Sequence, residues 1–401
     1  EIAEPEINEA IKILEAKAGL IEYQTKIYFS YDALEKAVVL SDRLMHDKFL
    51  PQKAMEIIQE AAVLVKNKHG SRKMITGEDV AQIITEKTKV PVTSITQGEA
   101  EKLMNLEKIM HQRIIGQDEA IKLVAAALRR SRAELRDNKR PIANFLFLGP
   151  TGVGKTETAK AVAESYFGGE DRMIRLDMSE YQEKDSVYRL LGAPGEAGGL
   201  LTEPVRKSPF SLLLLDEIEK AHPDILNIFL QVTDDGRVTD ATGRVIDFTN
   251  VILIATSNAG TSYIQEAIKQ GKAMESIKKD LIERELKGVF RPEFLNRFDA
   301  VVVFKPLEEK EILQIAKLIL GKIAKQMEAK GIFLQTTDAA AEELAHAGFD
   351  PIFGARPLRR VIQEKVQDAL ANFLLTKKVS RRDVVILEKG GVIRVEKARK
   401  L

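Results

Sequence analysis

A glycine-rich octapeptide at residues 149–156 has the composition of a phosphate-binding loop. It reads Gly149-Pro150-Thr151-Gly152-Val153-Gly154-Lys155-Thr156. Glycines let backbone N–H groups curl around phosphate oxygens, and a helix starting at the loop adds the positive end of its dipole. We expect ATP or ADP as the ligand, with Lys155 reaching the β- and γ-phosphates of ATP and Thr156 offering its hydroxyl to Mg²⁺. A glycine-rich turn that binds nothing is the alternative interpretation.

Two adjacent carboxylates, Asp216 and Glu217, follow a run of four leucines at residues 212–215. Ligands of open α/β sheets gather at the carboxyl ends of the strands, so these acids should lie beside the phosphate-binding loop. We expect Asp216 to hold the Mg²⁺ shell and Glu217 to polarise an attacking water as general base. A strand that simply ends in two solvated charges is the alternative.

Short apolar runs alternate with helix-period stretches between about residues 114 and 305, which favours an α/β domain with a mostly parallel sheet. Each run is nearly continuous, so we expect five strands buried on both faces. The first run leads into the glycine-rich loop and a helical pattern follows, which is the context that a phosphate-binding loop requires. The runs lie at residues 145–148, 173–176, 212–215, 251–254 and 301–304.

Helical patterns flank this α/β region on both sides. Residues 5–88 read as a small all-helical unit, in which Thr76 and Asp79 indicate a helix start. From residue 307 the pattern is again helical as far as residue 375, and a small hairpin follows around residues 389–391. We therefore expect three domains, at 1–92, 93–306 and 307–401. Because the sequence opens at Glu1 within an element, we also expect a fragment of a longer protein.

Composition narrows the classes of partner. The 61 Lys and Arg residues balance 60 Asp and Glu residues, so the formal net charge is +1 and the chain's overall electrostatics favour neither a polyanion nor a membrane surface. The absence of cysteine excludes disulfides, thiolate metal sites and cysteine nucleophiles. Since no apolar run approaches the roughly 20 residues that span a bilayer, we expect no membrane partner and a cytoplasmic location.

Several short strings occur in one order along the chain. They are Ile114-Ile115-Gly116-Gln117, the octapeptide at 149–156, residues 215–223, Thr256-Ser257-Asn258, residues 291–297 and Gly354-Ala355-Arg356-Pro357-Leu358. Together they resemble the second ATPase ring of the Clp family of AAA+ protein unfoldases, from about Ile109 to the C-terminus, and residues 1–92 resemble the helical lid of the first ring. The resemblance implies that residues 93–306 form the large ATPase domain and 307–401 its C-terminal lid.

The resemblance implies roles for further residues. Asn258 matches the sensor that orients water at the γ-phosphate, Arg297 matches the arginine finger that acts on the neighbouring subunit's nucleotide, and Arg356 matches the second sensor of the lid. Ile115 and Gly116 resemble the adenine contact. An arginine finger is worth about 10³ to 10⁵ in turnover in well-studied GTPases. The resemblance therefore implies a homo-oligomeric, hexameric ring. For each arginine, a surface or interdomain ion pair is the alternative.

The chain also departs from the family. Its members usually grip polypeptide with a tyrosine in a loop that here corresponds to residues 192–201, and this segment contains no aromatic residue. Either the first ring does the gripping, or the apolar pair Leu200 and Leu201 holds the substrate. Residues 259–290 carry no tripeptide that would dock a barrel protease, so a protease partner is not supported, and no long insertion of the disaggregase branch is found near residues 61–79.

Three functions remain open. The leading hypothesis is an ATP-driven subunit of a Clp-type ring that remodels or unfolds polypeptide substrates. An AAA+ nucleic-acid motor or loader is the alternative, because an ATPase core alone does not name its substrate. The best basic residues, at 129–132 and 139–140, interrupt a helical pattern and lack interleaved aromatics. A scaffold that binds ATP without turnover is the third, although the chain holds a complete set of expected catalytic residues.

Overall fold

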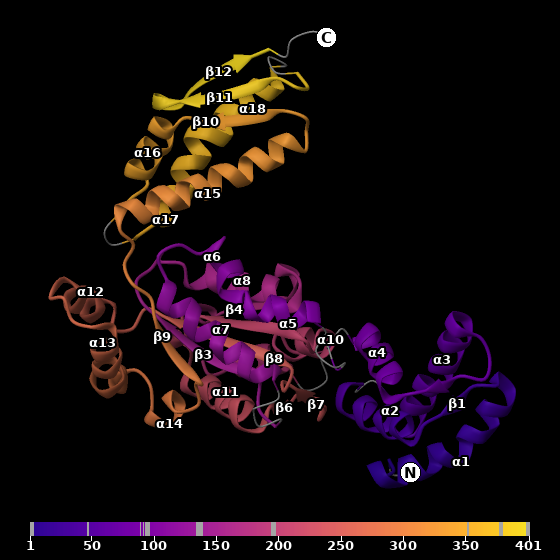
Figure 1. The fold of residues 1–401 in the computed structure, drawn as a ribbon. Coiled ribbons are helices and arrows are strands. Elements are labelled where there is room, and N and C mark those ends of the chain that lie inside the picture. Colours follow the sequence, from indigo (N-terminus) through magenta and orange to yellow (C-terminus); the bar gives the residue numbers. More distant parts are fainter. Residues whose placement is uncertain are drawn as a thin grey trace.

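The computed structural model describes residues 4–45, 48–88, 90, 92, 97–133, 139–193, 198–350, 353–376 and 380–397. Figure 1 shows a central body built on a sheet, a helical unit on its N-terminal side and a C-terminal unit joined to it through one extended segment. The linker residues 91 and 93–96, which carry the predicted boundary at 92/93, lie outside the described residues.

The central sheet has five parallel strands, as the sequence predicts, in the order β4-β5-β8-β3-β9. The interior strands β3, β5 and β8 are buried almost throughout. The expectation of burial on both faces was wrong for the edge strand β4, in which only Leu176 is buried, whereas β9 at the other edge is largely buried. The strands are β3 (Ala143–Leu148), β4 (Met173–Asp177), β5 (Ser211–Asp216), β8 (Val251–Ser257) and β9 (Ala300–Val303).

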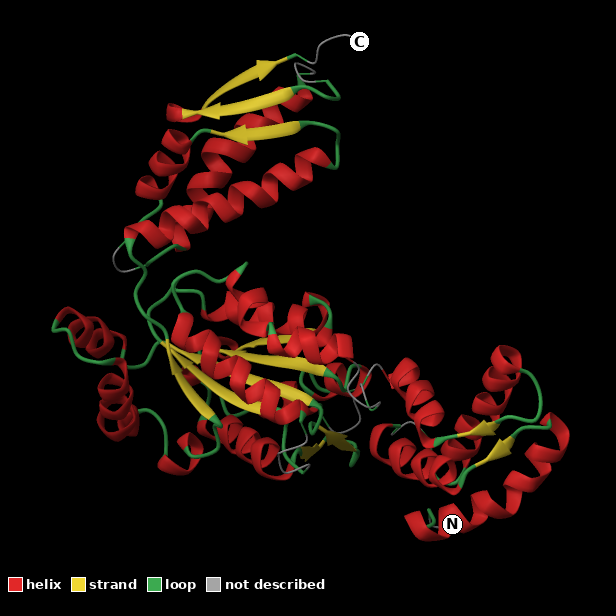
Figure 2. Ribbon diagram, viewed as in Figure 1, coloured by secondary structure: helices red, strands yellow, loops and turns green. Residues whose placement is uncertain are grey.

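Alternate residues of the strands point to opposite faces, and each face has its own core. Phe145 and Phe147 of β3 pack with helices α7 and α8, whereas Leu146 and Leu148 pack with α11 on the other side. Figure 2 shows the sheet between these helical layers. The helices of this body are α5 (Gln97–Met104), α6 (Leu106–His111), α7 (Asp118–Arg132), α8 (Lys155–Phe167), α9 (Ser186–Leu191), α10 (Thr202–Lys207), α11 (Pro223–Asp235), α12 (Thr261–Lys269), α13 (Met274–Asp280) and α14 (Pro292–Leu295).

A two-stranded hairpin, formed by β6 (Arg237–Thr239) and β7 (Val245–Asp247), follows α11 and was not predicted. Its strands have three residues each, which is too short for an alternating pattern to stand out. Lys139 and Arg140 occupy a turn before β3 and not a helix, and Arg140 Nε donates a hydrogen bond to the Thr233 carbonyl over 2.9 Å. The expectation that these two basic residues interrupt a helix was wrong.

The N-terminal unit consists of α1 (Ile7–Thr25), α2 (Tyr31–Leu44), α3 (Gln52–His69) and α4 (Gly77–Thr88), with two parallel two-residue strands, β1 (Tyr28–Phe29) and β2 (Met74–Ile75). It is therefore not entirely helical. The predicted start of α4 is confirmed, because Thr76 N and Oγ1 donate to Asp79 Oδ2 over 2.8 and 2.7 Å.

The C-terminal unit packs helices against a small sheet around its own apolar core. The expected hairpin of β11 (Val384–Glu388) and β12 (Val392–Glu396) is present, and a third strand, β10 (Phe333–Thr336), pairs with β11 in parallel. β10 was missed because it is short and none of its residues is fully buried. The helices are α15 (Glu309–Glu328), α16 (Asp338–Ala347), α17 (Arg356–Ile362) and α18 (Asp368–Leu375).

Candidate active site

The glycine-rich loop connects β3 to α8, and its glycines adopt conformations that other residues avoid. Gly149, Gly152 and Gly154 have φ values of +146°, +77° and +110°. A Cβ on Gly149 would lie 2.7 Å from the carbonyl oxygen of Phe304, and a Cβ on Gly152 would lie 2.1 Å from that of Phe353. The loop therefore needs glycine for backbone conformation and for space, and it leads directly into the first turn of α8.

Lys155, the first residue of α8, is 9% exposed and directs its ammonium group back into the loop. Its Nζ lies 2.5 Å from the Gly149 carbonyl oxygen, 2.9 Å from that of Pro150 and 2.9 Å from Asn258 Oδ1. Burial lowers the pKa of Lys155 to about 8, although the carboxylates of Glu219, Asp216 and Glu217 act in the opposite direction. A desolvated cation at a helix N-terminus suits an anionic ligand such as a phosphate.

Thr256 on β8 holds the two acids at the end of β5. Its hydroxyl, which is buried, donates to Asp216 Oδ1 over 2.5 Å and accepts from the backbone N–H of Glu217 over 3.2 Å. The other oxygen of Asp216 accepts from Arg175 over 2.7 Å. Glu217 adopts a left-handed conformation with φ of 56°. Such a conformation costs roughly 1–3 kcal/mol for a residue other than glycine and is common at functional sites.

Asn258 follows β8 and brings a third polar group to the loop. Its side-chain oxygen accepts from Lys155 and lies 3.5 Å from the Thr151 hydroxyl. Its backbone N–H donates to Glu219 Oε1 over 3.0 Å, while Glu219 Oε2 is buried without a hydrogen-bond partner among the described residues. Asn258 therefore lies beside the phosphate-binding loop, and Glu219, two positions after Glu217, fixes its backbone.

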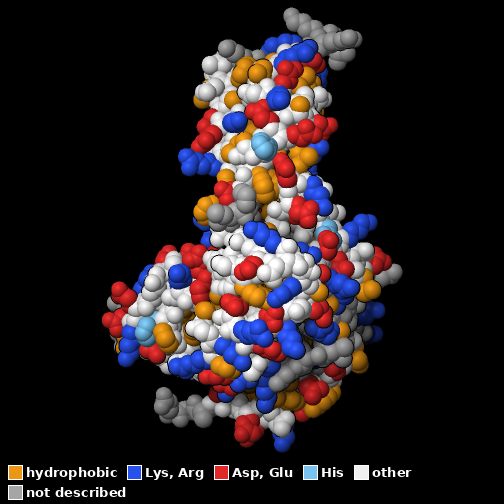
Figure 3. Space-filling view, turned by 90° about the vertical axis from the view of Figure 1, so that its left-hand side faces the viewer, with side chains coloured by type: hydrophobic (Ala, Val, Ile, Leu, Met, Phe, Trp, Pro, Cys, Tyr) orange, Lys and Arg blue, Asp and Glu red, His pale blue; other side chains and the backbone are white. Residues whose placement is uncertain are grey.

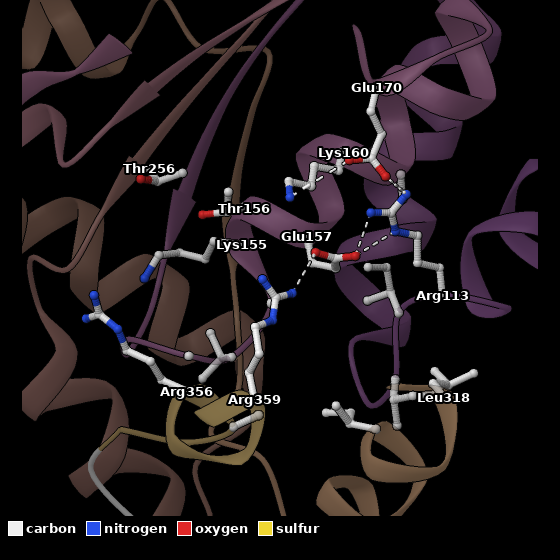
Figure 4. Close-up of a pocket in the computed structure, with 18 of the residues that line it drawn as sticks. Arg113, Lys155, Thr156, Glu157, Lys160, Glu170, Thr256, Leu318, Arg356 and Arg359 are labelled. Atoms are coloured by element: carbon white, nitrogen blue, oxygen red, sulfur yellow. Dashed lines mark hydrogen bonds and ion pairs between the residues drawn. The ribbon is translucent and has the colours of Figure 1, made fainter. Parts of the chain in front are cut away.

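The C-terminal unit contacts the phosphate-binding loop. The Ala355 N–H donates to the Gly152 carbonyl over 3.2 Å. Figure 4 shows Arg356 and Arg359 projecting from α17, the first toward Lys155 and the second toward Glu157. The Arg359 guanidinium lies 3.9 Å from a carboxylate oxygen of Glu157.

Arg113, in the segment between α6 and α7, binds three acids beside the loop. Its guanidinium lies 2.6 Å from Glu157, 2.7 Å from Glu164 and 2.7 Å from Glu170. Burial would lower the pKa of Arg113, but the hydrogen bonds to Glu170 and Glu157 outweigh burial and raise it. Lys322 of α15 also lies 3.7 Å from Glu157. Glu157, which directly follows the phosphate-binding loop, therefore pairs with Arg113 of the central body and with Lys322 of the C-terminal unit.

A cavity of about 1190 Å³ lies between the central body and the C-terminal unit. One end is polar and holds Lys155 and the two acids. The other is apolar, with Ile114 and Ile115 facing Ile315, Leu318 and Ile319 of α15. A cavity with one apolar and one polar end fits a nucleotide, whose base has apolar aromatic faces and whose phosphates are charged. The predicted residues that line it are Ile115, Thr151, Gly152, Val153, Gly154, Lys155, Thr156, Asp216, Glu217, Asn258 and Arg356.

Four predicted residues do not line the cavity. Gly149 and Pro150 contribute through their carbonyl oxygens, which bind Lys155. Gly116 forms a left-handed turn with φ of 73°, where a Cβ would lie 2.2 Å from a carboxylate oxygen of Glu311. The fourth, Arg297, lies elsewhere.

Arg297 lies near the N-terminal ends of the strands, whereas the phosphate-binding loop follows the C-terminal end of β3. It comes three residues before Ala300, which pairs with Phe145, while Val303 at the end of β9 pairs with Leu148 beside the loop. At about 3.3 Å per residue, the length of β3 places these two ends roughly 17 Å apart. Because an arginine side chain is shorter than this, Arg297 cannot reach the cavity of its own chain.

The described residues include no group of three or more His, Cys, Asp or Glu side chains that could hold a metal ion by themselves. Magnesium commonly takes only one or two protein ligands and completes its shell with waters and substrate phosphates. Thr156 and Asp216 both line the cavity and both offer hard oxygen ligands. The two residues therefore fit a Mg²⁺ ion that arrives with a nucleotide.

Sequence reasoning missed several residues of the site. Arg359 could have been found, because it lies three positions after Arg356 and so on the same face of α17. Arg113 and Arg175 gave no comparable signal, since their acidic partners are 41 to 57 positions away in the sequence. Thr256 was noted within a string, but its bridge between Asp216 and Glu217 depends on strand pairing.

Known families match consecutive parts of the chain. The family described as "AAA domain (Cdc48 subfamily)" matches residues 140–301. One described as "C-terminal, D2-small domain, of ClpB protein" matches residues 307–387, and one described as "AAA lid domain" matches residues 6–110.

Curated relatives and solved structures point to the same family. The chain is 41% identical over 458 residues to "Negative regulator of genetic competence ClpC/MecB" of Bacillus subtilis (strain 168), with 97% of this chain and 56% of the relative covered. It is 40% identical over 455 residues to the chaperone protein ClpB of Oceanobacillus iheyensis, with 96% of this chain and 56% of the relative covered. The chain thus spans about half the length of the curated relatives it matches. A structure described as the closed state of Hsp104 with ATPγS and casein superposes with a TM-score of 0.85 at 36% identity, covering 99% of this chain and 69% of that one. The resemblance inferred from the motifs is confirmed: the chain belongs to the Clp family of AAA+ ATPases.

Proposed function

We propose that this chain is an ATP-hydrolysing subunit of a ring that remodels or unfolds proteins. The observation that carries the proposal is the meeting of Lys155, Asp216, Glu217 and Asn258 at the polar end of one cavity. These groups supply a phosphate-binding cation, a carboxylate for a metal shell, a general base and a group that can orient water.

Within this proposal each residue has a defined task. Glu217 accepts a proton from the attacking water, and Asn258 positions that water. Arg356 contacts the phosphates from the lid, while Ile115 and the turn at Gly116 contact the adenine. Thr156 and Asp216 would hold Mg²⁺, which neutralises charge on the phosphates when it is bound.

We propose assembly into a hexameric ring in which Arg297 acts on the nucleotide of the neighbouring subunit. Its position at the far end of the strands supports action on another chain. The relatives support a polypeptide substrate, since two solved relatives are described as Hsp104 with casein. We further propose a cytoplasmic location and a division of the chain into domains at residues 92 and 306. Across the described residues, no helix is long and apolar enough to span a membrane.

The exchange of Glu217 for Gln tests the hydrolytic role. The E217Q variant keeps the shape and the hydrogen bonds of the site but removes the base, so ATP binding should persist while turnover falls at least about 10²-fold. Binding is measured with a fluorescent nucleotide, and turnover by phosphate release at saturating ATP. Turnover at the wild-type rate would remove Glu217 from this role.

The face of the molecule drawn in Figure 3 does not favour a nucleic-acid motor. Figure 3 shows Lys and Arg side chains interspersed with Asp and Glu over the face in view, without a continuous basic stripe. Nucleic-acid binding relies on such a stripe. The direct test compares ATP turnover with added unfolded protein and with added single-stranded DNA. We expect stimulation by the unfolded protein, and stimulation by DNA alone would overturn the proposed substrate class.

A further inference from the structure

The side chain of Arg297 is held by an acid from a different element. Its Nε lies 2.8 Å from Asp234 Oδ1, at the C-terminal end of α11. The Nε atom is buried, and its contact with Asp234 is an ion pair that lacks the geometry of a hydrogen bond, whereas the side chain as a whole is 40% exposed. The carboxylate therefore holds the inner side of the guanidinium group, and the exposed area belongs to other atoms of the side chain.

The position of Asp234 is unfavourable for α11 alone. The C-terminal end of a helix carries a partial negative charge and favours a cation. The last turn of α11 contains no basic residue and ends in Asp234 and Asp235. Among the residues that the structure describes, Arg297 is the partner within ion-pair distance of Asp234. The favourable partner of this carboxylate thus comes from the segment after α14 and not from its own helix.

The backbone around Arg297 is fixed by packing. Phe294, at the end of α14, contacts Phe290 and Phe298, and Phe290 and Phe294 are buried in the core that α11 also joins. The Arg297 N–H donates to the Phe294 carbonyl over 3.2 Å. The backbone position is therefore set by the core, while the direction of the guanidinium group depends on Asp234.

We propose that Asp234 is a positioning residue that presents the Arg297 guanidinium to the nucleotide site of a neighbouring subunit. This inference rests on the proposed function, in which Arg297 acts on another chain. Asp234 contacts neither the nucleotide nor the water. It restricts the rotamers of Arg297 before the subunits meet, so that Arg297 loses less conformational entropy when it contacts the phosphates.

The first test is the steady-state kinetics of the D234N variant. It should lower kcat about 10- to 100-fold, because misplacement of a catalytic group by about 1 Å can cost 10²-fold. The KM for ATP should stay within about twofold, since Asp234 lies far from the cavity of its own chain. The D234E variant keeps a carboxylate and should recover kcat to within about threefold of wild type. An unchanged kcat in D234N would overturn the proposal.

D235N is the matched control. It removes the same charge from the same helix end, but Asp235 is exposed, and in the described part of the chain Arg297 pairs with Asp234 instead. We expect wild-type kcat in this variant. An equal loss in D235N and D234N would assign the effect to the charge of the helix end and would overturn the specific role of Asp234.

Mixed rings decide whether Asp234 acts on the neighbouring site. E217Q subunits lack the base but keep Arg297 and Asp234, so they can complete the intact site of a D234N neighbour. Random mixing in equal amounts should return turnover to about one quarter of wild type. At one junction in four, a D234N subunit supplies the site with Glu217 and an E217Q subunit supplies Arg297 held by Asp234. An R297A variant mixed with E217Q is the positive control and should recover to the same level.

The outcomes separate the two proposals. Recovery in the R297A mixture but not in the D234N mixture would show that Asp234 acts only within its own subunit, which overturns this inference and leaves the proposed function intact. Recovery in neither mixture would overturn the action of Arg297 on a neighbour, and the positioning role of Asp234 with it. The unfolding midpoint of D234N should stay within about 3 °C of wild type, because both side chains of the ion pair are partly exposed and the asparagine keeps the shape of the aspartate.

Discussion

The exchange of Thr256 for Val removes one buried hydroxyl and tests how the acid pair is held. Valine has nearly the same shape, so the packing around β8 is preserved. The change deletes the donor to Asp216 Oδ1 and the acceptor for the Glu217 N–H. An unsatisfied buried polar group costs about 1–3 kcal/mol. Asp216 is partly exposed, so water can replace part of the hydrogen bond that it loses, and the expected decrease in the free energy of unfolding is about 2–4 kcal/mol.

The effect on turnover should exceed a general loss of stability. Glu217 depends on its backbone hydrogen bond to Thr256 to stay in a left-handed conformation that costs roughly 1–3 kcal/mol. Without this bond we expect kcat to fall about 10- to 100-fold, which corresponds to about 1.4–2.8 kcal/mol in the barrier. Nucleotide affinity should change less than about threefold, because Lys155 and its three oxygen partners are untouched.

The assay combines phosphate release with nucleotide binding and thermal unfolding, all at a temperature at which the variant is folded. T256S is the matched control, because it keeps the hydroxyl and should retain kcat within about threefold. A T256V variant with a lowered unfolding midpoint but wild-type kcat would refute the reasoning, since Thr256 would then support the core without positioning Glu217.

Further outcomes follow from the same geometry. G152A places a methyl group 2.1 Å from the Phe353 carbonyl at a positive φ, so nucleotide affinity measured by titration should fall at least about tenfold. The protonated form of Lys155 binds phosphate, and the pKa of Lys155 is about 8. ADP affinity measured by calorimetry should therefore be full below pH 8 and fall up to about tenfold per pH unit above it. An affinity that stays constant up to pH 9.5 would contradict this. The L201S variant places a hydroxyl at a fully buried position and should lower the free energy of unfolding by about 2–4 kcal/mol. The L200S variant changes a half-exposed position and should alter this free energy by less than about 0.5 kcal/mol. Equal denaturation midpoints for the two variants would contradict this.

The contrast between Leu200 and Leu201 also corrects a sequence-based alternative. The sequence-based alternative has the apolar pair Leu200 and Leu201 hold the substrate together. Leu201 is fully buried in the core with Leu190 and Val205, and only Leu200 is exposed, at 51%. The neighbouring residues 194–197 lie outside the described residues. A test of this loop on polypeptide substrates should therefore change Leu200 alone, because a change at Leu201 would act through folding.

The parts predicted from sequence are those in which residues close in the chain act together. The phosphate-binding loop and the strand before it are contiguous, and the leucine run before Asp216 is apolar enough to mark a buried interior strand. Local composition therefore located the phosphate-binding loop and the acid pair at the polar end of the cavity. The strand β4 was also located, but its edge position depends on sheet order, which a single run does not encode.

The parts that could not be predicted depend on pairs distant in the sequence. Thr256 reaches Asp216 because β5 and β8 are neighbours in the sheet, and Arg175 reaches the same acid because β4 lies on the other side of β5. Motif reasoning could name Arg297, but its ion pair with Asp234 requires the packing of α14 against the core of α11.

The hydrogen bond between Ala355 and Gly152 joins the two sides of the cavity through main-chain atoms alone. No side-chain rotation can lengthen or shorten this junction, so it has little mechanical play. We therefore expect a shift of the phosphate-binding loop to be transmitted to the turn before α17 without any change of side-chain rotamer. Main-chain coupling of this kind does not depend on which side chains occupy positions 152 and 355.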